Sequence, residues 1–185
     1  MASATDPRYD GLIAGYAALA IVIHILEAGL PSPVPGIKPG LANVVTLIAL
    51  LRHGWAVAVW VAVLRVLVSA LLLGTFMTPT FVLSASGAAL SLAGLGLAQA
   101  LNLGLGRPVL SAYGLALVAA FLHTQGQFWV AWALFVPHPG LLHLLPVLSA
   151  AALLFGLLSG HLAAQLERRM QRMESAAARA CAPPA

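Results

Sequence analysis

The chain has 185 residues, of which 61% are hydrophobic and only 8% are charged, and its formal net charge is +4 with histidine neutral. Soluble domains carry roughly 25% charged residues, so this composition excludes a water-soluble globular domain. The long apolar runs are continuous and do not alternate, which favours spanning helices over a transmembrane barrel. The sequence therefore predicts an all-α integral membrane protein.

The N-terminal part predicts a short tail followed by a first membrane helix. Residues 1–10 lack a basic segment before a short apolar core, so we expect a cytoplasmic tail and no cleaved signal peptide. The first apolar run, Gly11–Leu30, opens with a GxxxG pair and repeats that spacing in alanine on the adjacent face. Small residues at this spacing allow helices to pack closely, either inside the bundle or against another membrane subunit. The residues predicted to dock such a partner are Gly11, Ala14, Gly15 and Ala18.

The second apolar run, Leu41–Leu51, is short. At 1.5 Å per residue it covers about 17 Å of a hydrocarbon core of roughly 30 Å. It predicts a short or tilted span, or a re-entrant helix buried among the others. The connection before it, PSPVPGIKPG, holds four prolines, which fix φ and stiffen the loop.

Four longer runs complete the predicted membrane domain. They are Trp55–Leu73, Phe81–Leu103, Val109–Phe135 and Leu141–Leu166. Basic residues follow the second, fourth and last runs, and we place them on the cytoplasmic side. This favours six spans of a bacterial inner membrane with both termini in the cytoplasm. Five spans with an outer N-terminus remain an alternative. The range 11–166 is then a single transmembrane domain.

The last segment, residues 167–185, is predicted to be a basic cytoplasmic tail. Basic residues beyond a final span are typical of a topology signal, and this favours the membrane over nucleic acid as the reason for the positive charge. The arginines in this segment are Arg168, Arg169, Arg172 and Arg179.

One charge inside the third predicted span carries most of the functional information. Arg65 is the only charged residue of Trp55–Leu73, and an arginine at membrane depth costs at least about 2.5–3.5 kcal/mol. Counting 1.5 Å per residue from the inner side places Arg65, His24 and His123 at a similar depth of about 20 Å. Such a shared level in the outer half predicts a pocket open to the outside.

The predicted substrate-binding residues gather at this level. A planar guanidinium is well matched to phosphate or carboxylate, so the set predicts an anionic ligand with an apolar or aromatic part. Two alternatives stay open: Arg65 and Glu27 form a structural ion pair, or His123 and Gln127 only join helices. No metal, cofactor or catalytic residue is expected. The set is Glu27, Lys38, Asn43, Arg65, Ser69, Thr75, His123 and Gln127.

Several strings resemble one known family in their order and spacing. VPGIKPGLANVVTLIAL, LRVLVSALLLGTF, LSASGAALSL and HTQGQFWVAWAL are similar to the Gx transporter family, also described as heptaprenyl diphosphate synthase component I. That family resembles the substrate-binding S-components of energy-coupling factor (ECF) vitamin transporters. The resemblance covers roughly Gly11 to Leu166. It implies six helices with a short second helix, an outward pocket, and a first helix that docks on a transmembrane coupling subunit.

The resemblance also implies substrates, namely flavins such as riboflavin, FMN and FAD, or isoprenoid diphosphates. We expect the chain not to be an enzyme itself, because its five acidic residues do not cluster as a Mg²⁺-diphosphate site requires. The chain has no P-loop, so transport driven by ATP would need partner ATPases. The alternative function is a non-transporting accessory or anchor subunit of an isoprenoid synthase or an extracytoplasmic redox system.

Overall fold

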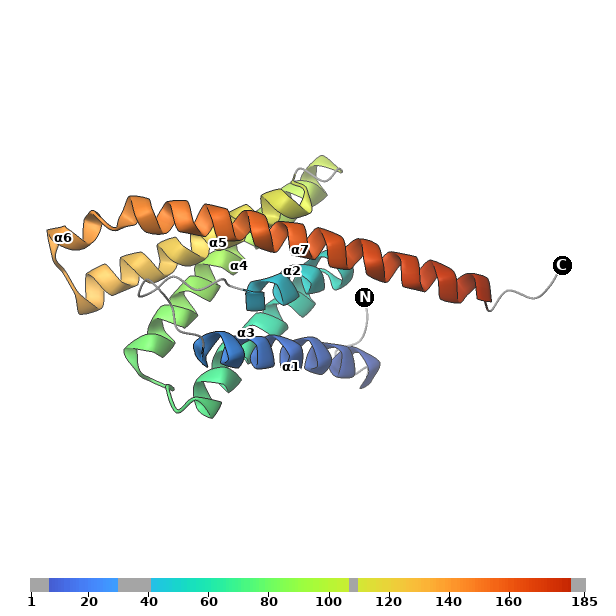
Figure 1. The fold of residues 1–185 in the computed structure, drawn as a ribbon, viewed down its shortest axis with the longest axis horizontal. Coiled ribbons are helices and arrows are strands. Elements are labelled where there is room, and N and C mark those ends of the chain that lie inside the picture. Colours follow the sequence, from blue (N-terminus) through green and yellow to red (C-terminus); the bar gives the residue numbers. More distant parts are fainter. Residues whose placement is uncertain (1–6, 30–40, 107–109, 181–185) are drawn as a thin grey trace.

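The computed structural model describes residues 7–29, 41–106 and 110–180, and these parts consist of helices and short connections (Figure 1). Its elements follow the predicted apolar runs closely, and α1 begins within the expected N-terminal tail. In chain order they are α1 (Pro7–Gly29), α2 (Leu41–His53), α3 (Trp55–Leu72), α4 (Pro79–Leu105), α5 (Ala112–Val130), a π-helical turn η1 (Ala131–Phe135), α6 (Pro139–Leu142) and α7 (Leu145–Ala180).

Four segments within the described residues are long and apolar enough to cross a membrane, which confirms a helical membrane protein. They are Tyr9–Gly29, Trp55–Leu72, Pro79–Leu105 and Pro139–Ala177. The other two large helices differ for separate reasons. α2 has only 13 residues, whereas α5 has 19 residues but carries the polar sequence HTQGQ in its second half.

The short helix α2 forms the centre of the molecule. It packs against α1, α3, α5 and α7, and every residue from Val44 to Leu50 is buried. A helix that is apolar on all sides is stable in such a position because its neighbours cover its whole surface. The prediction of a short second helix is confirmed, and the apolar sequence of its middle is explained by burial within the bundle.

Helices α4 and α5 approach each other through glycine. A Cβ atom added to Gly126 would lie 2.6 Å from the backbone oxygen of Ser86, and one added to Gly94 would lie 2.1 Å from the Leu122 side chain. Small residues at a helix interface let the backbones come close in a membrane. Gly87 and Gly94 of α4 and Gly126 of α5 thus allow the close contact of this pair of helices.

The longest helix, α7, passes along the bundle and extends beyond it (Figure 1). α1 begins and α7 ends toward the same end of the molecule, on the right in Figure 1, and α6 lies at the opposite end. The extension is held to α2 because Arg52 Nη2 donates to Glu174 Oε1 at 2.6 Å and Arg52 Nε lies 3.7 Å from Glu167 Oε2. Much of the expected C-terminal tail is therefore a continuation of α7.

Candidate functional site

A cavity of about 490 Å³ lies among the helices, and all six of the large helices contribute to its wall. We call it the central cavity. Five predicted binding residues from α1, α2, α3 and α5 line it, which confirms that they meet at one place although not that they bind a substrate. These five are Glu27, Asn43, Arg65, His123 and Gln127, and Thr75 joins them from the α3–α4 connection.

Arg65 lies near the middle of α3 and is only 5% exposed. Its Nη1 donates to Asn43 Oδ1 at 2.7 Å, while its buried Nε has no hydrogen-bond partner among the described residues. A buried donor without a partner costs free energy, and more so when the group is charged. The wall of the cavity therefore presents a guanidinium with unused hydrogen-bonding capacity.

Glu27, in the last turn of α1, binds the start of α2 and not the guanidinium. Its Oε1 accepts from the backbone N–H of Leu41 at 2.6 Å and its Oε2 accepts from that of Ala42 at 3.4 Å. The first N–H groups of a helix lack partners within the helix and carry partial positive charge, so a carboxylate stabilises them. No ion pair joins Arg65 to Glu27 in the described structure, and the structural ion pair considered from the sequence is not formed.

His123 and Gln127 lie one turn apart on α5 and contact each other, with 3.2 Å between their Nε2 atoms. The His123 ring is close to α4, because a Cβ atom added to Gly87 would lie 2.9 Å from its Nε2 atom. Its Nδ1 atom is buried and has no partner in the part of the chain that the structure describes. Both residues border the cavity, and their part in binding stays a prediction.

Two members of the predicted set stand apart from this cluster. Ser69 is 1% exposed, and its Oγ has no described partner. It is not part of the cavity wall, so the spacing of four residues from Arg65 did not place both side chains on the cavity. Lys38 falls outside the described residues. His24, which helix rise places at a depth similar to that of Arg65, lines the cavity as well.

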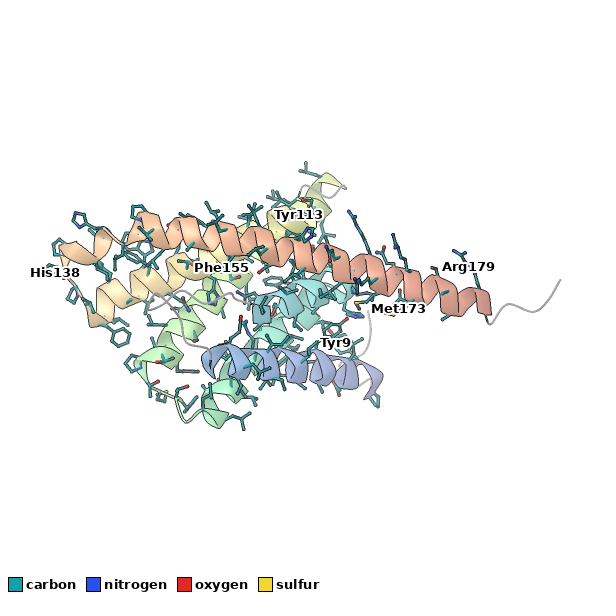
Figure 2. All side chains as sticks on the ribbon, in the orientation of Figure 1. Tyr9, Tyr113, His138, Phe155, Met173 and Arg179 are labelled. Carbon is teal, nitrogen blue, oxygen red and sulfur yellow. The ribbon has the colours of Figure 1, made fainter. Side chains whose placement is uncertain are left out.

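The wall formed by α7 was not predicted from the sequence. Leu148, Ala151, Ala152, Phe155 and Ser159 come from this helix and line the cavity, and Phe155 lies in the first third of α7, toward α6 (Figure 2). Small and apolar residues are common throughout membrane helices, so their chemistry does not identify the side of α7 that faces a cavity. Only their spacing places them on one side of the helix. The cavity therefore has polar residues from α1, α2, α3 and α5 and a mainly apolar wall from α7.

The predicted docking residues of α1 face away from the bundle. Gly11, Ala14, Gly15 and Ala18 are all exposed, and a Cβ atom added to either glycine would meet nothing within 4 Å. Packing within the bundle, the simpler of the two interpretations for this motif, is therefore wrong for this face. Whether a partner covers it stays a prediction.

Comparison with known proteins identifies the family. The family model described as heptaprenyl diphosphate synthase component I matches residues 16–166. The chain belongs to this family. The resemblance to this family seen in the sequence strings is thereby confirmed, and the match contains all of the residues that line the central cavity. No curated protein matches the chain, and no solved structure matches it.

Proposed function

We propose that this member of the family is the substrate-binding subunit of a membrane transporter, similar to an ECF S-component. In this proposal the chain crosses the inner membrane six times, both termini are cytoplasmic, and the central cavity receives its ligand from the outside. The observation that carries the proposal is the buried Nε of Arg65, which has no described partner on the wall of a 490 Å³ cavity. Intramembrane charges usually mark a functional site.

The chemistry of the cavity supports an amphiphilic anion as the ligand. Its volume lies within the range of roughly 300–1,000 Å³ that is usual for small-molecule sites. Arg65 would bind a phosphate or carboxylate, the amide groups of Asn43 and Gln127 would orient polar edges, and Phe155 with the alanines of α5 and α7 would cover an apolar or aromatic body. Flavins and isoprenoid diphosphates both combine these parts.

We also propose that the chain binds its ligand and does not transform it. Its three glutamates are separated and already engaged, Glu27 by the backbone of α2 and Glu167 with Glu174 by Arg52. Mg²⁺-dependent diphosphate chemistry requires carboxylates that converge on the metal. Energy for transport would come from partner ATPases through a transmembrane coupling subunit, which would dock on the small-residue face of α1.

A second candidate function is that of an accessory or anchor subunit of an isoprenoid synthase, which agrees with the description of the family. The arginines of the α7 extension are exposed and would contact such an enzyme. The two functions differ in which residues matter. The accessory function requires the extension and tolerates changes in the cavity, whereas the transporter function requires Arg65.

The experiment that tests the proposal combines identification of the ligand with a matched pair of variants. Mass spectrometry of the purified chain should reveal a copurified flavin or isoprenoid diphosphate, and titration should then give its Kd. We expect Arg65→Gln to weaken binding at least about 30-fold, since truncating one partner of a buried charge contact costs roughly 2–5 kcal/mol. Arg169→Gln makes the same charge change at an exposed position and should leave Kd unchanged. Equal affinity of both variants for all these ligands would refute the site.

A further inference from the structure

A row of polar side chains runs along the surface of α7 where the apolar segment ends. His161, Gln165, Arg168 and Arg172 follow one another at intervals of four, three and four residues, which places them on one side of a helix. All four are exposed, although the segment Pro139–Ala177 is apolar enough to span a membrane. We call this row the α7 stripe.

The half of the α7 stripe formed by His161 and Gln165 is organised by one hydrogen bond to α5 and one within α7. Tyr113 Oη lies 3.1 Å from His161 Nδ1, and Gln165 Nε2 lies 2.7 Å from His161 Nε2. Tyr113 is labelled beside α7 in Figure 2. A lipid-facing polar group is expensive unless it has a partner. Tyr113, His161 and Gln165 are three such groups, bound to one another on the outer surface of the bundle. We infer that a polar part of the membrane contacts the protein here.

The other half of the α7 stripe, Arg168 and Arg172, carries positive charge that no acidic residue of the described structure balances. The only acidic residues of α7, Glu167 and Glu174, lie seven residues apart on another side of the helix and both contact Arg52. Arg168 and Arg172 take part in no ion pair within residues 7–29, 41–106 and 110–180. The carboxylates of α7 are therefore paired with Arg52 of α2, and these two guanidinium groups stay available for an external anion.

We propose that the α7 stripe binds the headgroup of an anionic phospholipid, with the phosphodiester on Arg168 and Arg172 and the polar headgroup atoms near Gln165 and His161. Arg168 follows Leu166, the last residue of the continuous apolar run, by two positions, about 3 Å along the axis. The headgroup layer is roughly 5–7 Å thick on each side, and arginine side chains extend several ångströms along a helix to reach it. Fixed phosphate and guanidinium pairs are strong because they are charge-assisted.

Arg179 distinguishes a lipid ligand from a soluble acidic partner, because only the second would contact it. It continues the α7 stripe seven residues beyond Arg172, about 10 Å further along the axis, on the part of the helix that extends past the bundle in Figure 2. A phospholipid headgroup in the plane of the membrane would not reach it. An acidic protein lying along the whole extension would contact it as closely as it contacts Arg172.

The test measures phospholipid binding to the full chain by native mass spectrometry in a neutral detergent. Phosphatidylglycerol should bind and phosphatidylcholine should bind at least tenfold more weakly. A basic residue near the surface contributes about 1 kcal/mol of attraction to anionic lipid, or about fivefold in affinity, so the double variant Arg168→Gln/Arg172→Gln should lose roughly twentyfold. Arg169→Gln, which removes a neighbouring charge about 100° around the helix, should lose less than twofold.

Several outcomes would overturn the proposal. Equal losses in Arg169→Gln and in single Arg168→Gln would show general attraction to charge and no built site. A loss in Arg179→Gln as large as in Arg172→Gln would show attraction to charge along the whole extension and no site confined to the headgroup level. Competition by millimolar inorganic phosphate would indicate a site for the free anion. His161→Leu tests the hydrogen-bonded half and should lower phosphatidylglycerol affinity several-fold, with circular dichroism confirming that the variant is folded.

Discussion

Arg65 Nη1 donates to Asn43 Oδ1 at 2.7 Å, across the contact between α3 and the first turn of α2. Glu27 of α1 binds the backbone N–H groups of Leu41 and Ala42 immediately before that asparagine. The start of α2 thus links a carboxylate on one helix to a guanidinium on another without direct contact between them. Because the carboxylate is occupied in this way, it does not neutralise Arg65 through an ion pair.

The first prediction concerns the contact of Glu27 with α2. Glu27→Ala removes both acceptors from the start of α2, and loss of a helix N-cap costs about 1–2 kcal/mol. The variant should unfold at a temperature several degrees lower and should also bind the ligand more weakly, because Asn43 is no longer held against Arg65. Thermal unfolding and ligand titration in detergent measure the two effects separately.

Glu27→Gln serves as the conservative partner of that variant. It keeps one acceptor oxygen for the Leu41 N–H and should recover much of the stability and affinity lost in Glu27→Ala. A Glu27→Gln variant as damaged as Glu27→Ala would mean that the negative charge itself is needed, and the positioning role argued from the two backbone contacts would be wrong.

The second prediction concerns the approach of α4 to α5. Gly126→Ala places a Cβ atom 2.6 Å from the Ser86 backbone oxygen, so the two helices must separate. Overpacking of this kind costs about 1–3 kcal/mol. The midpoint of thermal unfolding should fall by several degrees. Gly104→Ala, on α4 with nothing within 4 Å of the new atom, is the matched control and should be neutral.

The helices could be predicted from the sequence because hydrophobicity and length decide them in a membrane. The level of Arg65, His123 and Glu27 could be predicted as well, since helix rise converts residue count into depth. The partners of these residues could not be predicted. Glu27 binds backbone N–H groups, which have no sequence signature. Ser69 is buried and absent from the cavity wall, which depends on how the neighbouring helices pack around α3.

The same reasoning explains the missed wall of α7. Ala151, Ala152 and Phe155 look like ordinary membrane-helix residues, and only the three-dimensional arrangement shows that they border a cavity. The continuation of α7 beyond the apolar run was missed for another reason. Residues 167–180 are polar, and their helix is fixed to α2 by the contact of Arg52 with Glu174, two residues that lie 122 positions apart.

The third prediction concerns that contact. Glu174 is largely exposed, its side chain being 65% accessible, and exposed ion pairs contribute only about 0–1 kcal/mol. Glu174→Gln should therefore leave the unfolding midpoint almost unchanged while amide hydrogen exchange in residues 170–180 becomes faster. High salt should produce the same local effect in the unmodified chain because it screens exposed charges. Unaltered exchange would show that the extension is held by its other contacts.

The fourth prediction concerns the exposed small-residue face of α1. Gly15→Ile should be well tolerated in the isolated chain, since a Cβ atom there meets nothing within 4 Å. If a transmembrane partner docks on this face, the larger side chain should abolish copurification of a coexpressed coupling subunit while thermal stability is kept. Copurification at the unmodified level would remove this face from the proposed interface.

The last prediction tests the cavity without changing its charges. Ala151→Phe adds a ring from α7 to the apolar wall opposite Arg65, and the introduced volume should exclude the body of the ligand. We expect binding to weaken roughly tenfold or more, because forcing extra atoms into an occupied site costs about 1–3 kcal/mol. Leu153→Phe lies two residues away, at a position that is 43% exposed on the outer side of the same helix, and it should bind normally. If Ala151→Phe also binds normally while Arg65→Gln does not, the ligand contacts the guanidinium from outside the cavity, and the volume enclosed by α5 and α7 has another role.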